Sequence, residues 1–202
     1  MTEELFNYDK AFGVTALAGV DEAGRGPLAG PVVTACCMLP LDEMIEGIND
    51  SKKVSEKKRE KLFDIIMQKA NYAISIVDCE TIDEINILAA TKKAMSECIE
   101  KMPVRPDLVL VDAVELDTDV KLKSIIKGDA TSYNIAAASI LAKVTRDRIM
   151  REMDALYPEY GFAKHKGYGT KDHINALIKY GPCPIHRMTF IKNFIGKIYA
   201  DN

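Results

Sequence analysis

Apolar runs and amphipathic segments follow one another along this chain. Uninterrupted apolar runs are typical of strands that are buried on both faces, whereas apolar residues spaced three or four apart are typical of helices. The runs predict strands at 17–22, 31–39, 72–78, 107–112 and 122–127. The helical spacing predicts helices at 55–70, from 81 to about 102, from 131 or 132 to about 158, at 170–180 and from about 190.

Capping residues place several of these helix ends. Ser55 and Thr170 precede helical patterns, and Thr81 with Glu84 matches a capping box. Small residues at 136–139 predict that the long helix packs closely against a sheet. Residues 163–170 read as a basic, glycine-rich loop.

The order of elements predicts an α/β class with a mixed sheet, because strands come first and then alternate with helices. We expect a short, loosely held leader at 1–16 and a core at 17–160. A basic helical segment at 161–202 should pack on that core. A chain of 202 residues is long enough for one substantial hydrophobic core.

Charge is distributed unevenly. The net charge is −3, and residues 161–202 hold seven Lys or Arg against two Asp or Glu, which gives +5 there and −8 on 1–160. Within the acidic part, 52–61 holds six bases and two acids. Basic patches beside an acidic body suit a protein that grips phosphates around a carboxylate site, although lysine-rich helices are often only solvated surface.

The cysteines and the N-terminus indicate a cytoplasmic protein. The five cysteines contain no C-x-x-C pair, so we read them as reduced thiols. The N-terminus lacks a signal-peptide pattern, and no apolar run has the length of a membrane span. We therefore expect no membrane association.

The stretch 17–30 carries the most chemical information. Asp21 and Glu22 follow the first apolar run, and the turn after them contains Gly24, Arg25 and Gly26. Two carboxylates at a strand end favour a bound metal ion, although an Asp there also commonly caps a turn. The glycine spacing fits neither the dinucleotide fingerprint nor a P-loop.

Asp112 and Asp129 also stand at predicted strand ends. If the strands that end at Asp21 and Asp112 are neighbours, the carboxylates gather at one edge of the sheet. Hard oxygen ligands select Mg²⁺ or Mn²⁺, and no His/Cys cluster offers an alternative metal site. Two such ions can drive phosphodiester hydrolysis, which leaves a 5′-phosphate and a 3′-hydroxyl.

These motifs, taken together, resemble the bacterial ribonuclease HII family, which is the type 2 ribonuclease H. The likeness spans Leu17 to Phe194 and begins with the Asp-Glu-Ala-Gly-Arg-Gly motif at 21–26. It continues through NDSKK at 49–53, LVDA at 110–113, KGD at 127–129, AASILAK at 137–143, HKGYGT at 165–170 and HRMTF at 186–190. Each motif is weak alone, but their shared order is specific.

The resemblance implies a ribonuclease H-like fold with a five-stranded mixed sheet flanked by helices and a small helical C-terminal segment. It implies Asp21, Glu22 and Asp112 as primary ligands of two Mn²⁺ or Mg²⁺ ions, with Asp129 as the fourth carboxylate. Asp147 competes for that fourth role, and the alternative reading is a solvated helix position.

The resemblance also implies a substrate. It is an RNA–DNA hybrid, or duplex DNA with embedded single ribonucleotides cut on the 5′ side. The backbone of Gly24, Arg25 and Gly26 would sense the ribose 2′-hydroxyl together with Tyr168, which would reach the site only on closure of the C-terminal segment. Candidate phosphate contacts are Lys52, Lys53, Lys143, Lys166 and Arg187, with His165 and His186 as further options.

Three alternatives remain open at this point. The type 3 enzymes are disfavoured by Arg25 in the turn and by the 16 residues before the first strand. A non-catalytic nucleic-acid-binding protein is disfavoured by four carboxylates, which would hinder phosphate binding. A DNA-only nuclease or resolvase is the third alternative. We expect a monomer.

Overall fold

A computed structural model describes residues 2–112 and 114–192. Its centre is one five-stranded sheet in the order β3-β2-β1-β4-β5. The strands are β1 (Leu17–Ala23), β2 (Val32–Met38), β3 (Asn71–Val77), β4 (Leu108–Asp112) and β5 (Leu122–Ile125). The mixed sheet and its flanking helices confirm the predicted fold class.

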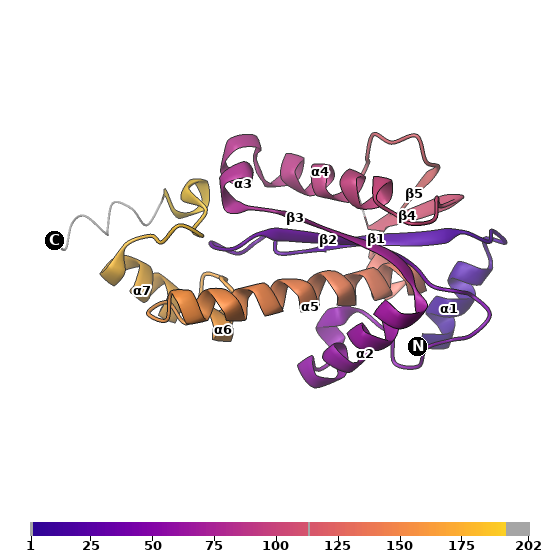
Figure 1. The fold of residues 1–202 in the computed structure, drawn as a ribbon, viewed down its shortest axis with the longest axis horizontal. Helices are drawn as coiled ribbons and strands as arrows, with labels where there is room; N and C mark the ends of the chain where they lie inside the picture. The colour runs from indigo at the N-terminus through magenta and orange to yellow at the C-terminus, as the bar shows by residue number, and fades with distance from the viewer. Residues whose placement is uncertain (1, 113, 193–202) are drawn as a thin grey trace.

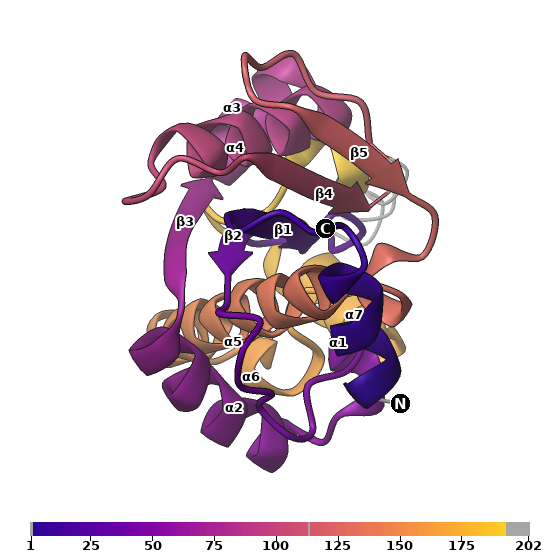
Figure 2. The ribbon, with the colours of Figure 1, turned by 90° about the vertical axis from the view of Figure 1, so that its right-hand side faces the viewer.

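Helices cover both faces of the sheet (Figures 1 and 2). On one face lie α3 (Cys79–Ile85) and α4 (Ile87–Glu100), and on the other lie α1 (Thr2–Lys10), α2 (Glu56–Lys69) and α5 (Tyr133–Leu156). Every residue of β2 is buried, because its odd positions face α5 while its even positions face α4. This double coverage explains why the strand is an apolar run without polar alternation.

Strand direction brings the predicted ligands to one edge of the sheet. β1 runs antiparallel to β2 and parallel to β4, with Val20 beside Val111. The carboxyl ends of β1 and β4 therefore meet, and Asp21 and Asp112 lie one position beyond this pair on adjacent strands.

The long helix α5 lies close against β1. Ser132 caps it by accepting a hydrogen bond from the Ile135 amide at 3.2 Å. A Cβ atom on Gly19 would lie 2.2 Å from the Ile135 nitrogen, so only glycine permits this approach. The small residues at 136–138 are fully buried in the core cluster that also contains residues of β2, which confirms the packing interpretation of that run.

The N-terminal residues differ from the expected loose leader. They form α1, and Leu5 and Phe6 join the core cluster beneath α5. Asp9 is fully buried and accepts hydrogen bonds from the Asn134 amide at 2.8 Å and the Asn134 side chain at 2.9 Å. The expected leader is therefore an amphipathic helix, with acidic residues on its exposed side and apolar residues on its buried side.

The helix expected from 81 to about 102 is two helices, because Asn86 adopts a left-handed φ of 69° between α3 and α4. The cap also differs from the predicted capping box: the N-cap residue is Asp78 and not Thr81, and Asp78 accepts a hydrogen bond from the Thr81 amide at 2.8 Å.

Shorter elements complete the chain. They are the 3₁₀ turns η1 (Ser51–Lys53) and η2 (Gly128–Ala130) and the helices α6 (Phe162–His165) and α7 (Lys171–Tyr180). The predicted loop at 163–170 therefore begins as helix. The helix expected from about Phe190 is present at 188–192, and the residues after it lie outside the described part of the chain. Within 2–112 and 114–192, no helix is both long and apolar enough to span a membrane.

Candidate active site

Four carboxylates from three parts of the chain line one cavity of about 380 Å³. Asp21 and Glu22 project from β1, and Asp112 is the last residue of β4. Asp129 lies in η2 and not at a strand end, since β5 stops at Ile125. The Gly128 amide donates to Asp112 Oδ1 at 2.9 Å, which fixes η2 beside the end of β4.

The carboxylates are crowded and only partly neutralised. Burial and the neighbouring charge of Glu22 raise the pKa of Asp21 well above its usual range. Burial also raises the pKa of Glu22, against the opposing effect of Arg25, whose Nη1 lies 3.5 Å from Glu22 Oε1. Burial and the charge of Asp50 raise the pKa of Asp129. Additional positive charge in this cavity would therefore relieve repulsion.

The donor set fits a hard divalent cation. In the described part of the chain, no three His, Cys, Asp or Glu side chains already surround a single metal position. Mg²⁺-type sites commonly use one or two carboxylates and complete their shell with water and substrate phosphates, so a preformed protein cage is not required. Lys52 Nζ, 3.5 Å from Asp129 Oδ2, supplies positive charge at this position.

The glycine turn forms another wall of the same cavity. Gly24 has a φ of 102°, and a Cβ atom there would lie 2.1 Å from Arg146 Nε. The turn therefore requires glycine at this position both for its conformation and for space. At Gly26 an added Cβ would lie 3.8 Å from Tyr168 Cε1, which is an ordinary contact.

Tyr168 already lies at the cavity, which differs from the expectation that it arrives only on closure. Tyr168 is 46% exposed, so it is accessible to a ligand in the cavity. Its backbone is fixed: the Tyr168 amide donates to the His165 carbonyl at 2.9 Å, and the Leu28 amide donates to the Gly167 carbonyl at 2.8 Å. Chain segments about 140 residues apart thus meet at the cavity.

Arg187 does not have the position of a phosphate contact. It is fully buried, and its guanidinium donates to the carbonyl oxygens of Gly24 at 2.6 Å, Arg25 at 3.0 Å and Gly30 at 2.7 Å. The predicted phosphate contact is therefore wrong. Arg187 holds the carbonyl groups of the glycine turn and, being buried, cannot reach a duplex.

The lysines divide into two groups. Lys52 and Lys143 line the cavity. Lys53 is exposed beside it, and the Lys166 ammonium donates to the Ala163 carbonyl. Neither Lys53 nor Lys166 lines the cavity, so their predicted phosphate contacts gain no support from its geometry.

The histidines lie away from the cavity in a buried cluster. His173 Nε2 and His186 Nε2 are 3.0 Å apart, and the His165 ring stacks on that of His173 with centroids 4.5 Å apart. His165 and His186 are both buried, so neither is placed to contact a phosphate. The cluster supports the Tyr168 loop, since His173 Nδ1 lies 2.9 Å from the Tyr168 carbonyl oxygen.

Sequence reasoning missed Arg146, Ser51 and Ser139, which also line the cavity. Arg146 is almost completely buried and donates to the carbonyl oxygens of Pro31 at 2.9 Å, Ala29 at 3.0 Å and Lys166 at 2.9 Å. It lies between other charged and polar residues of a helix, where the local pattern indicates a solvated side chain. No signal within the single sequence distinguishes it.

Comparison with known proteins agrees with this fold. The family model for ribonuclease HII matches residues 18–193. A ribonuclease HII of Acetivibrio thermocellus is 61% identical over 185 residues, which are 91% of this chain and 72% of that protein. One from Caldanaerobacter subterraneus subsp. tengcongensis is 57% identical over 198 residues, covering 96% of this chain and 82% of its own.

A solved ribonuclease H2 from Pyrococcus horikoshii OT3 superposes with a TM-score of 0.77 at 28% identity, covering 91% of this chain and 98% of its own. The sheet and its flanking helices are those of the ribonuclease H-like fold. The chain belongs to the ribonuclease HII family. It is accordingly an endoribonuclease.

Proposed function

We propose that this chain hydrolyses the RNA strand of RNA–DNA hybrids and also cuts 5′ of single ribonucleotides embedded in duplex DNA. The observation that carries the proposal is the single cavity shared by four carboxylates, the glycine turn and Tyr168. In the proposed complex, a phosphodiester beside a ribose would contact all three. The endoribonuclease family and the names of its relatives support the same substrate class.

The carboxylates Asp21, Glu22, Asp112 and Asp129 would hold two divalent ions, Mn²⁺ or Mg²⁺. When bound, such ions lower the pKa of a nucleophilic water and stabilise the leaving oxygen in phosphodiester hydrolysis, which leaves a 5′-phosphate and a 3′-hydroxyl. The raised carboxyl pKa values of Asp21, Glu22 and Asp129 support cation binding here.

Substrate choice would rest on the other walls of the cavity. The turn at Gly24, Arg25 and Gly26 presents backbone groups at close range, and a ribose 2′-hydroxyl both donates and accepts hydrogen bonds. The exposed ring of Tyr168 would stack on the sugar of the next nucleotide. Lys52 and Lys143 would contact flanking phosphates. One chain lines the whole cavity, so we expect a monomer to be active.

A cleavage assay on three matched duplexes tests the proposal. These are a continuous RNA–DNA hybrid, a DNA duplex with one ribonucleotide, and the same duplex without it, each in Mn²⁺, Mg²⁺ or chelator. We expect metal-dependent cleavage of the first two only, with the embedded site cut on its 5′ side. Cleavage of the all-DNA duplex would favour a DNA nuclease, and binding without cleavage would favour a non-catalytic protein.

Substitution of the ligands tests the site within that assay. Asp21→Asn and Asp112→Asn should each abolish cleavage while substrate binding persists. Asp129→Asn should cost far more activity than Asp147→Asn. Near-wild-type turnover of either of the first two variants would refute the metal site, and the reverse order for the second pair would transfer the fourth ligand to Asp147.

A further inference from the structure

We propose that Asp147 is a positioning residue, which holds the ammonium group of Lys143 at the wall of the carboxylate cavity so that it can bind a substrate phosphate. The proposal rests on the proposed function, because it assigns Lys143 to the backbone of the bound nucleic acid. It replaces both earlier interpretations of Asp147, the solvated helix position and the fourth carboxylate of the metal site.

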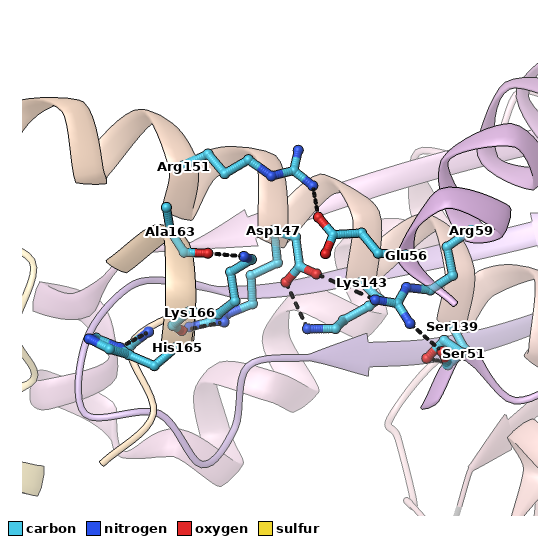
Figure 3. Close-up of polar contacts among 12 residues, drawn as sticks. Ser51, Glu56, Arg59, Ser139, Lys143, Asp147, Arg151, Ala163, His165 and Lys166 are labelled. Atoms are coloured by element: carbon cyan, nitrogen blue, oxygen red, sulfur yellow. Dashed lines mark hydrogen bonds and ion pairs between the residues drawn. The ribbon is translucent and has the colours of Figure 1, made fainter. Parts of the chain in front are cut away.

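Asp147 is enclosed by cations and not by solvent (Figure 3). It is only 3% exposed. Its Oδ1 accepts a hydrogen bond from Lys143 Nζ at 2.7 Å, and its Oδ2 lies 4.0 Å from Arg59 Nη2. Each carboxylate oxygen thus faces its own positive group, and Asp147 is not among the residues that line the cavity. A metal ligand would have to exchange these partners.

Lys143 connects this ion pair to the cavity. It stands one helical turn before Asp147 on α5 and does line the cavity. An ammonium group has three N–H donors, so the bond to Asp147 leaves two for a phosphate oxygen. Because a free lysine side chain has many rotamers, its anchoring to a buried carboxylate reduces the entropy lost when the phosphate binds.

Arg59 supports the neighbouring part of the cavity wall, which contains Ser51 and Lys52. Its Nη1 donates to the Ser51 carbonyl at 2.8 Å and also to the Val54 carbonyl, which clamps η1 from both ends. Ser139 on α5 donates to the Ser51 hydroxyl at 2.8 Å (Figure 3). The next residue after Ser51 is Lys52, which also lines the cavity.

Asp147 therefore connects the groups that hold Lys143 and Lys52 at the cavity. It holds Lys143 directly, and it faces the arginine that holds the segment of Lys52. The charges of this network are two cations and one anion, so it leaves a net positive charge beside the carboxylates. A carboxylate in this position organises the cations without cancelling their attraction for phosphate.

A double-mutant cycle on kcat/KM for a continuous hybrid tests the inference. Asp147→Asn should lower kcat/KM about tenfold, the typical effect of losing one charge-assisted hydrogen bond. Lys143→Met should lower it at least as much. In the Lys143→Met background, Asp147→Asn should add less than about a twofold loss, because its one direct hydrogen bond is to Lys143, whereas Arg59 lies 4.0 Å away and keeps its own hydrogen bonds to η1. The matched control is Asp119→Asn, which removes an exposed carboxylate from its ion pair with Arg105 and should leave kcat/KM unchanged.

Three results would overturn the inference. One is an equal fold-loss from Asp147→Asn in both backgrounds. Another is a several-fold rise in the Mn²⁺ concentration for half-maximal activity in Asp147→Asn, which would make Asp147 a metal ligand. The last is wild-type kcat/KM in Lys143→Met, which decides the matter even if Asp147→Asn does not fold. An inactive wild-type enzyme would contradict the proposed function itself, whereas active wild type with independent losses contradicts only the role of Asp147.

Discussion

The guanidinium of Arg187 donates a hydrogen bond to the carbonyl oxygen of Gly24 at 2.6 Å, across 163 positions of the chain. The same side chain also holds the carbonyl oxygens of Arg25 and Gly30. A fully buried guanidinium that donates to several backbone carbonyls sets the shape of the turn, because it fixes the positions of those carbonyl groups. The basic C-terminal segment thus contributes to the site from within the protein.

Replacement of Arg187 should therefore damage both the turn and the fold. Arg187→Met leaves buried carbonyl groups without donors, and we expect the free energy of unfolding to fall by about 3 kcal/mol. Urea denaturation measures this change. Arg105→Met, which removes an exposed arginine with an exposed partner, is the control and should have little effect. Equal losses in the two variants would mean that Arg187 does not hold the turn.

Asp21 should make the metal-free protein less stable at neutral pH. Its pKa is raised in the folded state, so the native protein holds this proton more tightly than the unfolded chain does. Stability is then greatest below the unfolded pKa near 3.8 and falls as the pH rises through the folded value. Asp21→Asn should remove that loss, and the variant should unfold at higher urea than wild type at pH 7 in chelator.

Metal addition provides the converse measurement. Mn²⁺ should raise the urea midpoint of wild type, because a ligand that binds only the native state stabilises it. It should have much less effect on Asp21→Asn. A variant less stable than wild type in chelator would show that Asp21 is not repelled by its neighbours, and an equal response to Mn²⁺ would show that it is not a ligand.

The sequence predicted those parts of the fold that depend on local pattern. Doubly covered strands are apolar runs, so β1, β2 and β4 were found within a residue or two of their observed ends. The residues Asp21 and Asp112 follow such runs, which placed them at strand ends. Local pattern could not show that β1 and β4 are parallel neighbours. Only the family resemblance supplied this topology.

Residues whose role depends on distant contacts were misread. Arg187 and Asp147 carry charges that local pattern assigns to solvent, yet both are buried because backbone carbonyls or cations from other elements surround them. The break at Asn86 was missed for a related reason: a left-handed φ leaves only a weak trace in sequence. The chain encodes these features through packing between segments far apart.

The histidine cluster predicts a pH dependence of stability. Burial, and then the proximity of His173, lowers the pKa of His186 from 6.5 to about 4. The unfolded chain takes up this proton first as the pH falls, so native stability is complete above pH 6.5 and is lost toward pH 4. His186 alone should cost about 2 kcal/mol between pH 7 and pH 5, because each pKa unit corresponds to about 1.4 kcal/mol.

The variant His186→Gln isolates this contribution. It should be less stable than wild type at pH 7, since the contacts with His173 and Cys183 change, yet it should lose less stability between pH 7 and pH 5. Urea unfolding at the two pH values gives both quantities. The same pH-dependent loss in variant and wild type would show that His186 titrates normally in the folded protein.

Tyr168 should control the cleavage of isolated ribonucleotides. Its ring lies next to Gly26, the residue is 46% exposed, and hydrogen bonds fix the backbone around it. Loss of the ring should misplace the scissile phosphate, and such displacements cost about 10²-fold in rate. Tyr168→Ala should therefore cut a single embedded ribonucleotide about 10²-fold more slowly. The loss should be smaller on a continuous hybrid, where many registers offer a cut site, and Tyr168→Phe should be milder because it keeps the ring.

Tyr180→Ala is the matched control, since that tyrosine is similarly exposed but does not line the cavity. A Tyr168→Ala enzyme that cuts the single ribonucleotide at the wild-type rate would leave sugar recognition to the glycine turn.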